Sequence, residues 1–576
     1  MLRSNASQYY YHHISKEKST LNKKSFLLYY MNKHKMTFYL VVFFTALQAL
    51  FGACFAIFFE RFIDYANAVT VLGFDYNEFW KKVIYLLIYI IVYVFINFMR
   101  RILRSELIVQ TDYDIKRDFF QTILSKDVQE YHIKETGFYL SRFTEDIPTI
   151  INDYILEFFN LVLYLCQSVF TIIVAFYINW IIASIYMVLS FVIIVYTSLF
   201  EKKFKDLRME MSSRNAEYVT GLKMYLEGYD YIKFQRAEEI FLRSFENKVK
   251  VLNNTKKQWW LLDSFYSPGN AFLTLLLTFA SIVFATFFYV NGVFSIGLLT
   301  ASIYLSTEIF NPISNLFEQI TYLKGNKQIA DTVFGELLNV KRDAGNALKK
   351  VQDCLLENVS VKYPGSDQYI LQQVNVRFTR GKKYLVVGSS GIGKSTLLKL
   401  LSGQIDYEGN IFLNQQELRT IDKSDLYQRI GYMPQSGFVF TDTIKNNIDI
   451  CHKHSDEEVY SIAEKVQLES FVKSKGMDSI VSEEILEVSG GEKQRLCLAR
   501  VLISMPEILL LDEVTAALDA ETSYQIETLI TSLDMTLFYV CHKLSPDIVS
   551  RFDYVVTFED KNIIVKDSGQ YVLPRY

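Results

Sequence analysis

The residues with the clearest chemical meaning form a glycine-rich stretch in the second half of the chain. The sequence GSSGIGKST follows an apolar run, KKYLVV, that predicts a β-strand, and it matches the phosphate-loop pattern G-x-x-x-x-G-K-[ST]. In such a loop, backbone N–H groups point inward and bind phosphate oxygens, the lysine reaches the β- and γ-phosphates, and the next hydroxyl ligates Mg²⁺. The predicted nucleotide-binding residues are Gly388, Ser389, Ser390, Gly391, Ile392, Gly393, Lys394, Ser395 and Thr396.

Two carboxylates follow a second apolar strand further along the chain. The run ILLLDE ends in Asp512 and Glu513. We expect Asp512 to hold Mg²⁺ through water and Glu513 to orient or deprotonate the attacking water. Tyr363, in the upstream sequence VKYPG, is suited to stacking on an adenine ring. These residues predict a site that binds and hydrolyses a nucleoside triphosphate.

A second candidate anion site lies between the phosphate loop and the two carboxylates. The sequence VSGGEKQR places Ser489, Gly490 and Gly491 at the expected N-terminus of a helix, where backbone N–H groups attract anions. A single bound nucleotide does not need two phosphate-binding sites from the same chain. We therefore expect this nest to serve the nucleotide of a second subunit.

Length and composition divide the chain into two different halves. The 576 residues are too many for one ordinary domain, and half of them are hydrophobic. Long apolar runs end at Leu316, whereas short strand-like runs alternate with helical patterns from about Val351 onward. The net charge of −3 gives no indication of a nucleic-acid partner. The six scattered cysteines lack C-x-x-C spacing and are interpreted as reduced residues.

Six apolar segments approach the roughly 20 residues that a helix needs to cross a bilayer. The last is the least apolar, because it contains Glu308, Asn311 and Pro312. The links at 102–151 and 200–268 are long, charged and helix-patterned, so we expect the spanning helices to extend beyond the membrane there. The six segments are Met36–Phe59, Val83–Phe98, Tyr154–Ile178, Trp180–Leu199, Ala271–Val290 and Ile296–Leu316.

Loop charges predict the orientation of these segments. Six lysines precede the first segment and three arginines follow the second, whereas the link between the two contains Asp64, Asp75 and Glu78. By the positive-inside rule, both termini and the soluble half are cytoplasmic, in a multi-pass protein of the cell membrane surrounded by lipid.

Three carboxylates fall within or beside the apolar segments. Asp153, Glu157 and Glu308 are candidates to line a central cavity, because ionisable groups inside a membrane are costly and often functional. Asp153 and Glu157 can equally lie at the inner membrane interface, where a charge costs little. For Glu308 the alternative is that the side chain has no functional role.

Taken together, the motifs resemble those of a bacterial half-size ABC transporter of the exporter fold (type IV). GSSGIGKST resembles the Walker A motif, VSGGE the signature motif, and ILLLDE Walker B with its catalytic glutamate. Val488 and Glu492 stand where the family usually has Leu and Gln. Three further motifs are similar to the Q-loop at Pro434–Gln435, the D-loop at Ala516–Asp519 and the switch histidine at His542.

The resemblance implies an all-α domain of six transmembrane helices followed by an α/β P-loop ATPase domain. The expected boundaries are a tail at 1–35, the membrane domain at 36–335, a linker at 336–350 and the ATP-binding domain at 351–576. Within the tail, SFLLYYM (residues 25–31) is either a short helix on the inner membrane surface or unstructured. Residues 134–146 and 217–234 resemble the two inner loops that contact the ATPase domains in this family.

The resemblance also implies a shared mechanism. Two Mg²⁺–ATP complexes lie between two such chains, each bound by Walker A of one chain and by Ser489, Gly490 and Gly491 of the other. Gln435 joins Ser395 and Asp512 at Mg²⁺, and Asp519 belongs to the same interface. Glu513 acts as base and His542 contacts the γ-phosphate. A homodimer is slightly favoured over a heterodimer.

The function that follows is ATP-driven transport by alternating access, with export of an amphipathic drug, peptide or lipid as the first hypothesis. An importer of a metal chelate on the same fold is the alternative. A regulatory or channel-like ABC subunit is a third. The residues do not identify the substrate.

Overall fold

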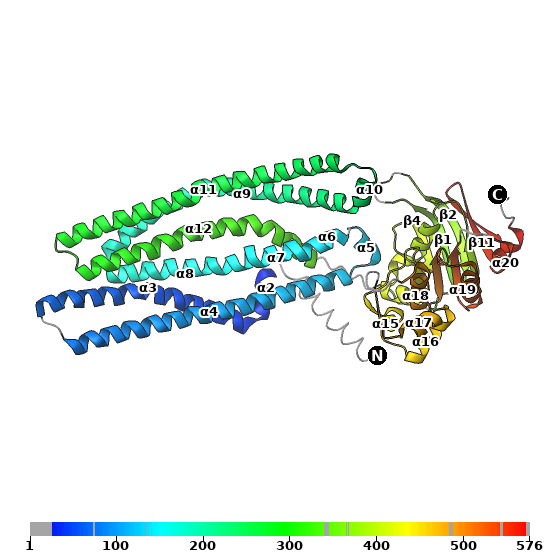
Figure 1. The fold of residues 1–576 in the computed structure, drawn as a ribbon, viewed down its shortest axis with the longest axis horizontal. Helices are drawn as coiled ribbons and strands as arrows, with labels where there is room; N and C mark the ends of the chain where they lie inside the picture. The colour runs from blue at the N-terminus through cyan, green and yellow to red at the C-terminus, as the bar shows by residue number, and fades with distance from the viewer. Residues whose placement is uncertain are drawn as a thin grey trace. The chain divides into compact units, whose positions relative to one another are not determined.

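The computed structural model divides the chain into two compact units, which are described separately. One unit comprises residues 1–125 and 135–340, and the other comprises residues 126–134 and 341–576. The structure describes residues 26–72, 75–134, 136–338, 345–348, 350–363, 366, 368–482, 488–541 and 545–571. We call the two parts the helical unit and the ATPase unit (Figure 1).

Six long helices form the helical unit and lie alongside one another in Figure 1. Within the described residues, five stretches are long and apolar enough to cross a membrane. Four of them lie in α3, α4, α9 and α11, and the fifth is the segment 136–178, whose last helix is α8. The bounds of the six long helices are Lys35–Leu72 (α3), Tyr76–Leu124 (α4), Leu156–Ile178 (α8), Trp180–Glu227 (α9), Glu238–Val290 (α11) and Ile296–Leu338 (α12).

The sixth predicted span lies in α12, which is helical but is less apolar than the five stretches named above. The position of α12 among the other helices explains the polar residues in this span. It contacts α3, α8, α9 and α11, and Ser302 and Ser306 are fully buried. The hydroxyls of both serines donate to backbone carbonyls three residues earlier, which satisfies them inside the protein. A helix enclosed by other helices needs less apolar surface than one that faces lipid.

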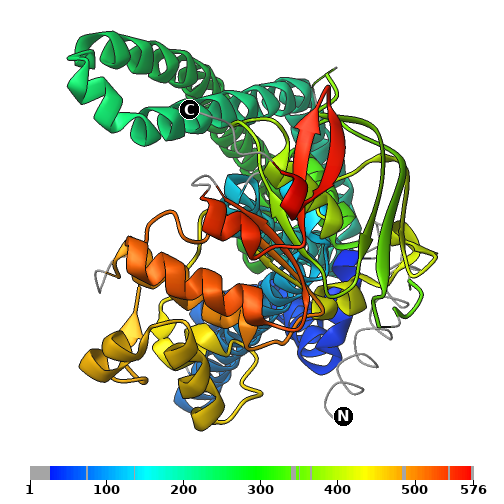
Figure 2. The ribbon, with the colours of Figure 1, turned by 90° about the vertical axis from the view of Figure 1, so that its right-hand side faces the viewer.

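The charged links between spans are helical, as the sequence predicts. α4 continues to Leu124, and α9 and α11 extend well beyond their apolar portions to the short helix α10 (Tyr229–Phe234), which joins them. Figure 2 shows the paired ends of α9 and α11 (green) standing apart from the other helices of this unit. Between α4 and α8 the chain forms α5 (Val128–His132), α6 (Thr136–Ser141), the π-helical turns η2 (Arg142–Asp146) and η3 (Ile151–Ile155), and α7 (Ile147–Ile150).

A short helix precedes the first span, at the segment where the sequence allowed either a helix or an unstructured tail. α2 (Phe26–Lys33) packs its Tyr30 and Met31 side chains completely into the helical unit. The Tyr30 hydroxyl donates to the buried carboxylate of Asp118 on α4 at 2.8 Å. Lys33 and His34 both contact Asp114 at 2.9 Å. The segment is therefore a packed helix fixed to α4.

The ATPase unit is built around a six-stranded, mostly parallel sheet in the order β12-β11-β3-β10-β9-β6. β3, β6, β9, β10 and β11 run parallel, and only β12 is antiparallel. The strands β9 and β10 are buried on both faces, which explains their continuous apolar sequences. The bounds are Lys383–Val386 (β3), Ile430–Met433 (β6), Ile508–Asp512 (β9), Thr536–Val540 (β10), Tyr554–Glu559 (β11) and Asn562–Asp567 (β12).

A smaller antiparallel sheet and a set of helices complete this unit. The second sheet has the order β2-β1-β4-β5, from Leu371–Thr379, Asp353–Val361, Glu408–Leu413 and Gln416–Glu417. A two-stranded sheet pairs β7 (Asp442–Thr443) with β8 (Ile480–Val481). The helices are Lys394–Leu401 (α13), Lys423–Arg429 (α14), Ile444–Ile448 (α15), Asp456–Lys465 (α16), Glu469–Lys475 (α17), Gly490–Leu502 (α18), Ala520–Ser532 (α19) and Pro546–Ser550 (α20). Short 3₁₀ turns cover Leu418–Thr420 (η4) and Ser568–Gln570 (η5).

Candidate nucleotide site

The predicted chemical residues of the ATPase unit gather at one edge of the large sheet. The phosphate loop follows β3, and Gln435 follows β6. Asp512 is the last residue of β9, and Glu513 comes directly after it. Because these strands are parallel, their carboxyl ends lie on the same edge, where open α/β sheets bind ligands. His542 follows β10, but it lies outside the described residues.

Backbone conformation gives the phosphate loop its shape. Gly391 and Gly393 have backbone φ angles of +79° and +117°, which residues with a side chain rarely adopt. The loop leads directly into α13, whose first residue, Lys394, is only 6% exposed. The Lys394 ammonium donates to the carbonyls of Gly388 at 2.8 Å and Ser389 at 3.3 Å. The cation therefore lies across the loop that the sequence predicts to bind phosphate.

Asp512 has the surroundings of a metal-binding carboxylate. It is 3% exposed, and its buried Oδ1 has no hydrogen-bond partner among the described residues. Burial raises the pKa of Asp512, and a hydrogen bond from Ser395 opposes that shift. An unpaired oxygen beside the Ser395 hydroxyl fits Mg²⁺, which prefers oxygen ligands and retains several waters. Ser395 and Asp512 would hold the ion, and it would supply charge neutralisation for phosphoryl transfer.

Gln435 and Glu513 are brought together by a direct hydrogen bond. The Gln435 amide donates to a Glu513 carboxylate oxygen at 2.8 Å. Glu513 has φ of +53°, a conformation that costs energy for a residue with a side chain and is concentrated at functional sites. Its backbone N–H donates to the carbonyl of Val540 on β10. This backbone turn ends β9 directly after Asp512.

Two tyrosines lie close to the carboxyl edge of the large sheet. The sequence indicated only one of them. Tyr363 is 38% exposed and its hydroxyl lies 3.3 Å from the hydroxyl of Thr396, the last residue of the loop pattern. Tyr432 on β6 was missed. Burial, with Asp512 and Tyr363 nearby, raises its pKa to about 12. Its position in GYMPQ, three residues before Gln435, is the signal that could have identified it.

The second nest is a capped helix N-terminus, as predicted for Ser489, Gly490 and Gly491. Ser489 is the N-cap of α18, and its hydroxyl accepts the N–H of Glu492. The Glu492 carboxylate in return accepts the N–H and hydroxyl of Ser489, at 2.9 and 2.7 Å. This reciprocal arrangement is a capping box. It places a negative charge at the helix end expected to meet phosphate.

The D-loop packs against this nest. A Cβ on Gly491 would lie 3.0 Å from a methyl of Leu518, so the two segments are in close contact there. Asp519, expected at the ATP interface, caps α19 within its own chain by accepting the N–H of Thr522 at 2.9 Å. Backbone hydrogen bonds hold the pKa of Asp519 below its usual range.

A short segment preceding the first predicted inner loop groups with the ATPase unit. That loop was predicted at residues 134–146, whereas the segment of the ATPase unit is Lys126–Lys134, which contains α5. Tyr427 on α14 interacts with the backbone of Val128, and Asp127 lies near Lys423. This segment meets the predicted loop at Lys134, and the resemblance of residues 134–146 to an inner loop remains a prediction.

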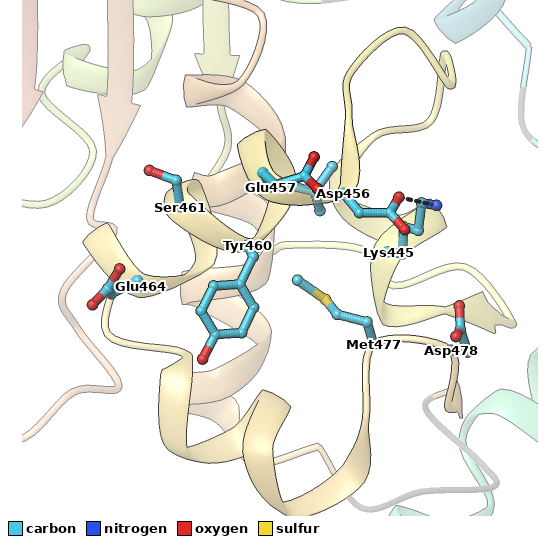
Figure 3. A pocket seen from close by; sticks show the side chains of 9 residues that line it. Lys445, Asp456, Glu457, Tyr460, Ser461, Glu464, Met477 and Asp478 are labelled. Atoms are coloured by element: carbon cyan, nitrogen blue, oxygen red, sulfur yellow. Dashed lines mark ion pairs between the residues drawn. The ribbon is translucent and has the colours of Figure 1, made fainter.

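Among the cavities lined by described residues, two lie away from this site. One, of about 430 Å³, lies between α15, α16 and the segment before β8, and an ion pair between Lys445 and Asp456 crosses its rim (Figure 3). The other, of about 680 Å³, is in the helical unit and contains the Arg208–Asp153 ion pair at 3.2 Å. Neither includes the phosphate loop, Asp512 or Glu513.

Comparisons with known proteins agree with this architecture. A family model described as "ABC transporter transmembrane region" matches residues 38–313, and one described as "ABC transporter" matches residues 371–516. An ATP-dependent lipid A-core flippase of Yersinia pestis bv. Antiqua is 26% identical over 464 residues, covering 78% of this chain and 79% of the relative. The multidrug resistance-like ATP-binding protein MdlB of Buchnera aphidicola is 26% identical over 495 residues, covering 84% of each.

A solved structure has the same fold. A bacterial Atm1-family ABC exporter with ATP bound superposes with a TM-score of 0.80 at 20% identity, covering 92% of this chain and 95% of that one.

Proposed function

The chain is an ABC transporter with its membrane-spanning region and its ATPase in one polypeptide, and from this premise we propose that it exports an amphipathic substrate by ATP-driven alternating access. The flippase and the multidrug resistance-like protein among its relatives support this direction and substrate class. Lipids and drugs share an apolar body with a polar or charged group, which is the kind of molecule a membrane-embedded site can select.

The observation that carries the proposal is that four residues predicted to act in hydrolysis gather at one sheet edge. Lys394 lies across the phosphate loop, Asp512 presents an unpaired buried oxygen, and Gln435 bonds to Glu513 at 2.8 Å. Glu513 is the group suited to orient or deprotonate water, and Gln435 fixes its carboxylate. A regulatory subunit would not need this arrangement to be intact.

The active form we propose is a dimer of two half-transporters, with two ATP molecules at its interface. The Ser489–Gly491 nest supports this, because it is a helix N-terminus suited to phosphate in addition to the phosphate loop of the same chain. We favour two identical chains slightly over two different ones. Gln435 is a further candidate Mg²⁺ ligand, Tyr363 a candidate adenine contact, and His542 a candidate γ-phosphate contact.

We propose that both termini and the ATPase unit are cytoplasmic. Lysines before α3 and arginines at the inner part of α4 support this orientation. Closing the ATP interface would draw the inner ends of the helices together and open the cavity outward. Hydrolysis would then reset the dimer.

Inside-out vesicles test the proposal. Purified protein reconstituted with a fluorescent lipid or an amphipathic dye should move it into the lumen only with Mg²⁺–ATP. Glu513→Gln protein is the blank. Movement in the opposite direction would support the importer instead, and ATP turnover without movement of any amphipathic compound would refute transport of this class.

A further inference from the structure

The structure distinguishes among the three carboxylates predicted near the spans. Asp153 pairs with Arg208 at 3.2 Å, and Glu157 accepts a hydrogen bond from Asn160 at 2.8 Å. Glu308 on α12 has neither an ion pair nor a hydrogen bond to any residue in the described part of the chain. It lies twelve residues after the start of α12, about 18 Å along the helix, which is near the middle of a bilayer core of about 30 Å.

Aromatic side chains from three helices form a cluster that adjoins Glu308. A Cβ on Gly52 of α3 would lie 3.9 Å from both Oε2 of Glu308 and a ring carbon of Tyr93 on α4. The missing side chain of Gly52 therefore leaves a space that the carboxylate and the Tyr93 ring both border. Tyr304, one turn before Glu308, donates its hydroxyl to the carbonyl of Gly52 at 3.0 Å, and its ring lies 5.1 Å from that of Phe55.

The side chains of this cluster are not fully enclosed within the chain. Glu308, Tyr93, Tyr304 and Phe55 are all partly exposed rather than buried. Within the described residues, no lysine, arginine or histidine lies within 4 Å of the Glu308 carboxylate. An ionised carboxylate in hydrocarbon is costly unless a cation accompanies it, so an entering positive charge would be stabilised there.

We propose that Glu308, with the rings of Tyr93, Tyr304 and Phe55, binds the positive charge of a lipophilic organic cation. The inference rests on the proposed export function and names its substrate class. Aromatic faces attract cations that have lost their water, and the carboxylate neutralises the charge. A metal ion fits poorly, because it needs several oxygen ligands and the surrounding groups are rings.

Two ions of the same shape and opposite charge test this directly. In nanodiscs of zwitterionic lipid, full-length protein should bind radiolabelled tetraphenylphosphonium more tightly than tetraphenylborate. Glu308→Gln, which keeps the side-chain shape, should weaken phosphonium binding at least tenfold and leave borate binding unchanged or stronger. Glu157→Gln, which removes a hydrogen-bonded carboxylate, is the matched control and should retain phosphonium binding. Equal phosphonium affinity in Glu308→Gln and the unchanged protein would overturn the proposal.

Substitutions of the aromatic residues provide a second test that leaves the charge of Glu308 unchanged. Tyr93→Leu should weaken phosphonium binding severalfold, whereas Tyr93→Phe should retain it, because the cation contacts the ring face. If Glu308→Gln instead removes only a pH dependence of transport and leaves phosphonium binding intact, Glu308 carries a proton and the site is refuted.

Failure of this site and failure of the export function give different results. If ATP drives lipid flipping but phosphonium binding does not depend on Glu308, export stands and the site falls. If phosphonium binding depends on Glu308 but Mg²⁺–ATP moves neither phosphonium nor lipid in vesicles, the site stands and export falls.

Discussion

The amide of Gln435 donates a 2.8 Å hydrogen bond to the carboxylate of Glu513, although 78 positions separate the two residues in sequence. The bond joins the loop after β6 to the turn after β9, which are neighbouring strands of the large sheet. Any movement of the Gln435 loop therefore changes the position of the proposed base.

Replacing Glu513 by glutamine should abolish turnover and preserve ATP binding. The amide keeps the size of the side chain but cannot accept a proton, and loss of a general base typically costs about 10²- to 10⁴-fold in rate. ATPase rate and equilibrium nucleotide binding are the two measurements. Full hydrolytic activity in this variant would refute the role of Glu513 as base.

Replacing Gln435 by alanine should slow turnover less than loss of Glu513 itself. The Glu513 carboxylate would remain but would lose one of its orienting contacts. We expect a fall in kcat of about tenfold, the equivalent of one hydrogen bond to a charged group. Gln435→Glu is an informative comparison, because two facing carboxylates should repel one another. A rate unchanged in both variants would show that the hydrogen bond has no part in hydrolysis.

Lys394→Ala should weaken nucleotide binding. Its buried ammonium contacts the carbonyls of Gly388 and Ser389, and it is the cation best placed to meet phosphate charge. A hydrogen bond involving a charged group contributes about 1.5–3 kcal/mol, which predicts roughly 10- to 100-fold weaker ATP binding. Lys399 lies further along the same helix and provides a control of equal charge. Unchanged affinity in Lys394→Ala would refute its phosphate role.

Much of this site could be predicted from the sequence, because its residues sit in short local patterns. The phosphate loop, Asp512 and Glu513 each directly follow or end an apolar strand, and parallel pairing brings such ends together. The proximity of Tyr432 to Asp512 could be suspected from the GYMPQ sequence but not established from it, since it depends on β6 lying beside β9. The grouping of α5 with the ATPase unit likewise depends on contacts between segments that are far apart in the sequence.

The membrane half was predicted less completely. The sequence predicted the sixth segment at Ile296–Leu316, and α12 is helical there, but its low apolar content could not be explained without its contacts with the other long helices. The same limit applies to Asp153, Glu157 and Glu308. All three look alike in sequence. In the structure Asp153 pairs with Arg208 on α9 and Glu157 accepts a hydrogen bond from Asn160 within its own helix, whereas Glu308 has no such partner among the described residues.

The aromatic face of α10 should be needed for coupling between hydrolysis and transport. Tyr231 and Phe234 are 78% and 86% exposed, and residues 217–234 resemble a loop that docks on the partner's ATPase domain in this family. Phe234→Ser should reduce substrate-stimulated ATPase activity and transport severalfold while leaving ATP binding intact. Leu242→Ser, on the exposed surface of α11, is the control. Normal coupling in Phe234→Ser would show that this face is not a docking surface.

Glu492→Gln should increase the apparent affinity for ATP. The carboxylate lies at the N-terminus of α18, bonded to Ser489 at 2.7 and 2.9 Å, so its charge opposes a phosphate that approaches the same helix end. Charges at helix ends contribute about 0.3–1 kcal/mol, which corresponds to a KM for ATP that is about two- to fivefold lower. Glutamine can still complete the capping box, so folding should be preserved. Glu521→Gln, in the first turn of α19, is the matched control and should leave KM unchanged. A KM that rises in Glu492→Gln would mean that the carboxylate assists the bound nucleotide.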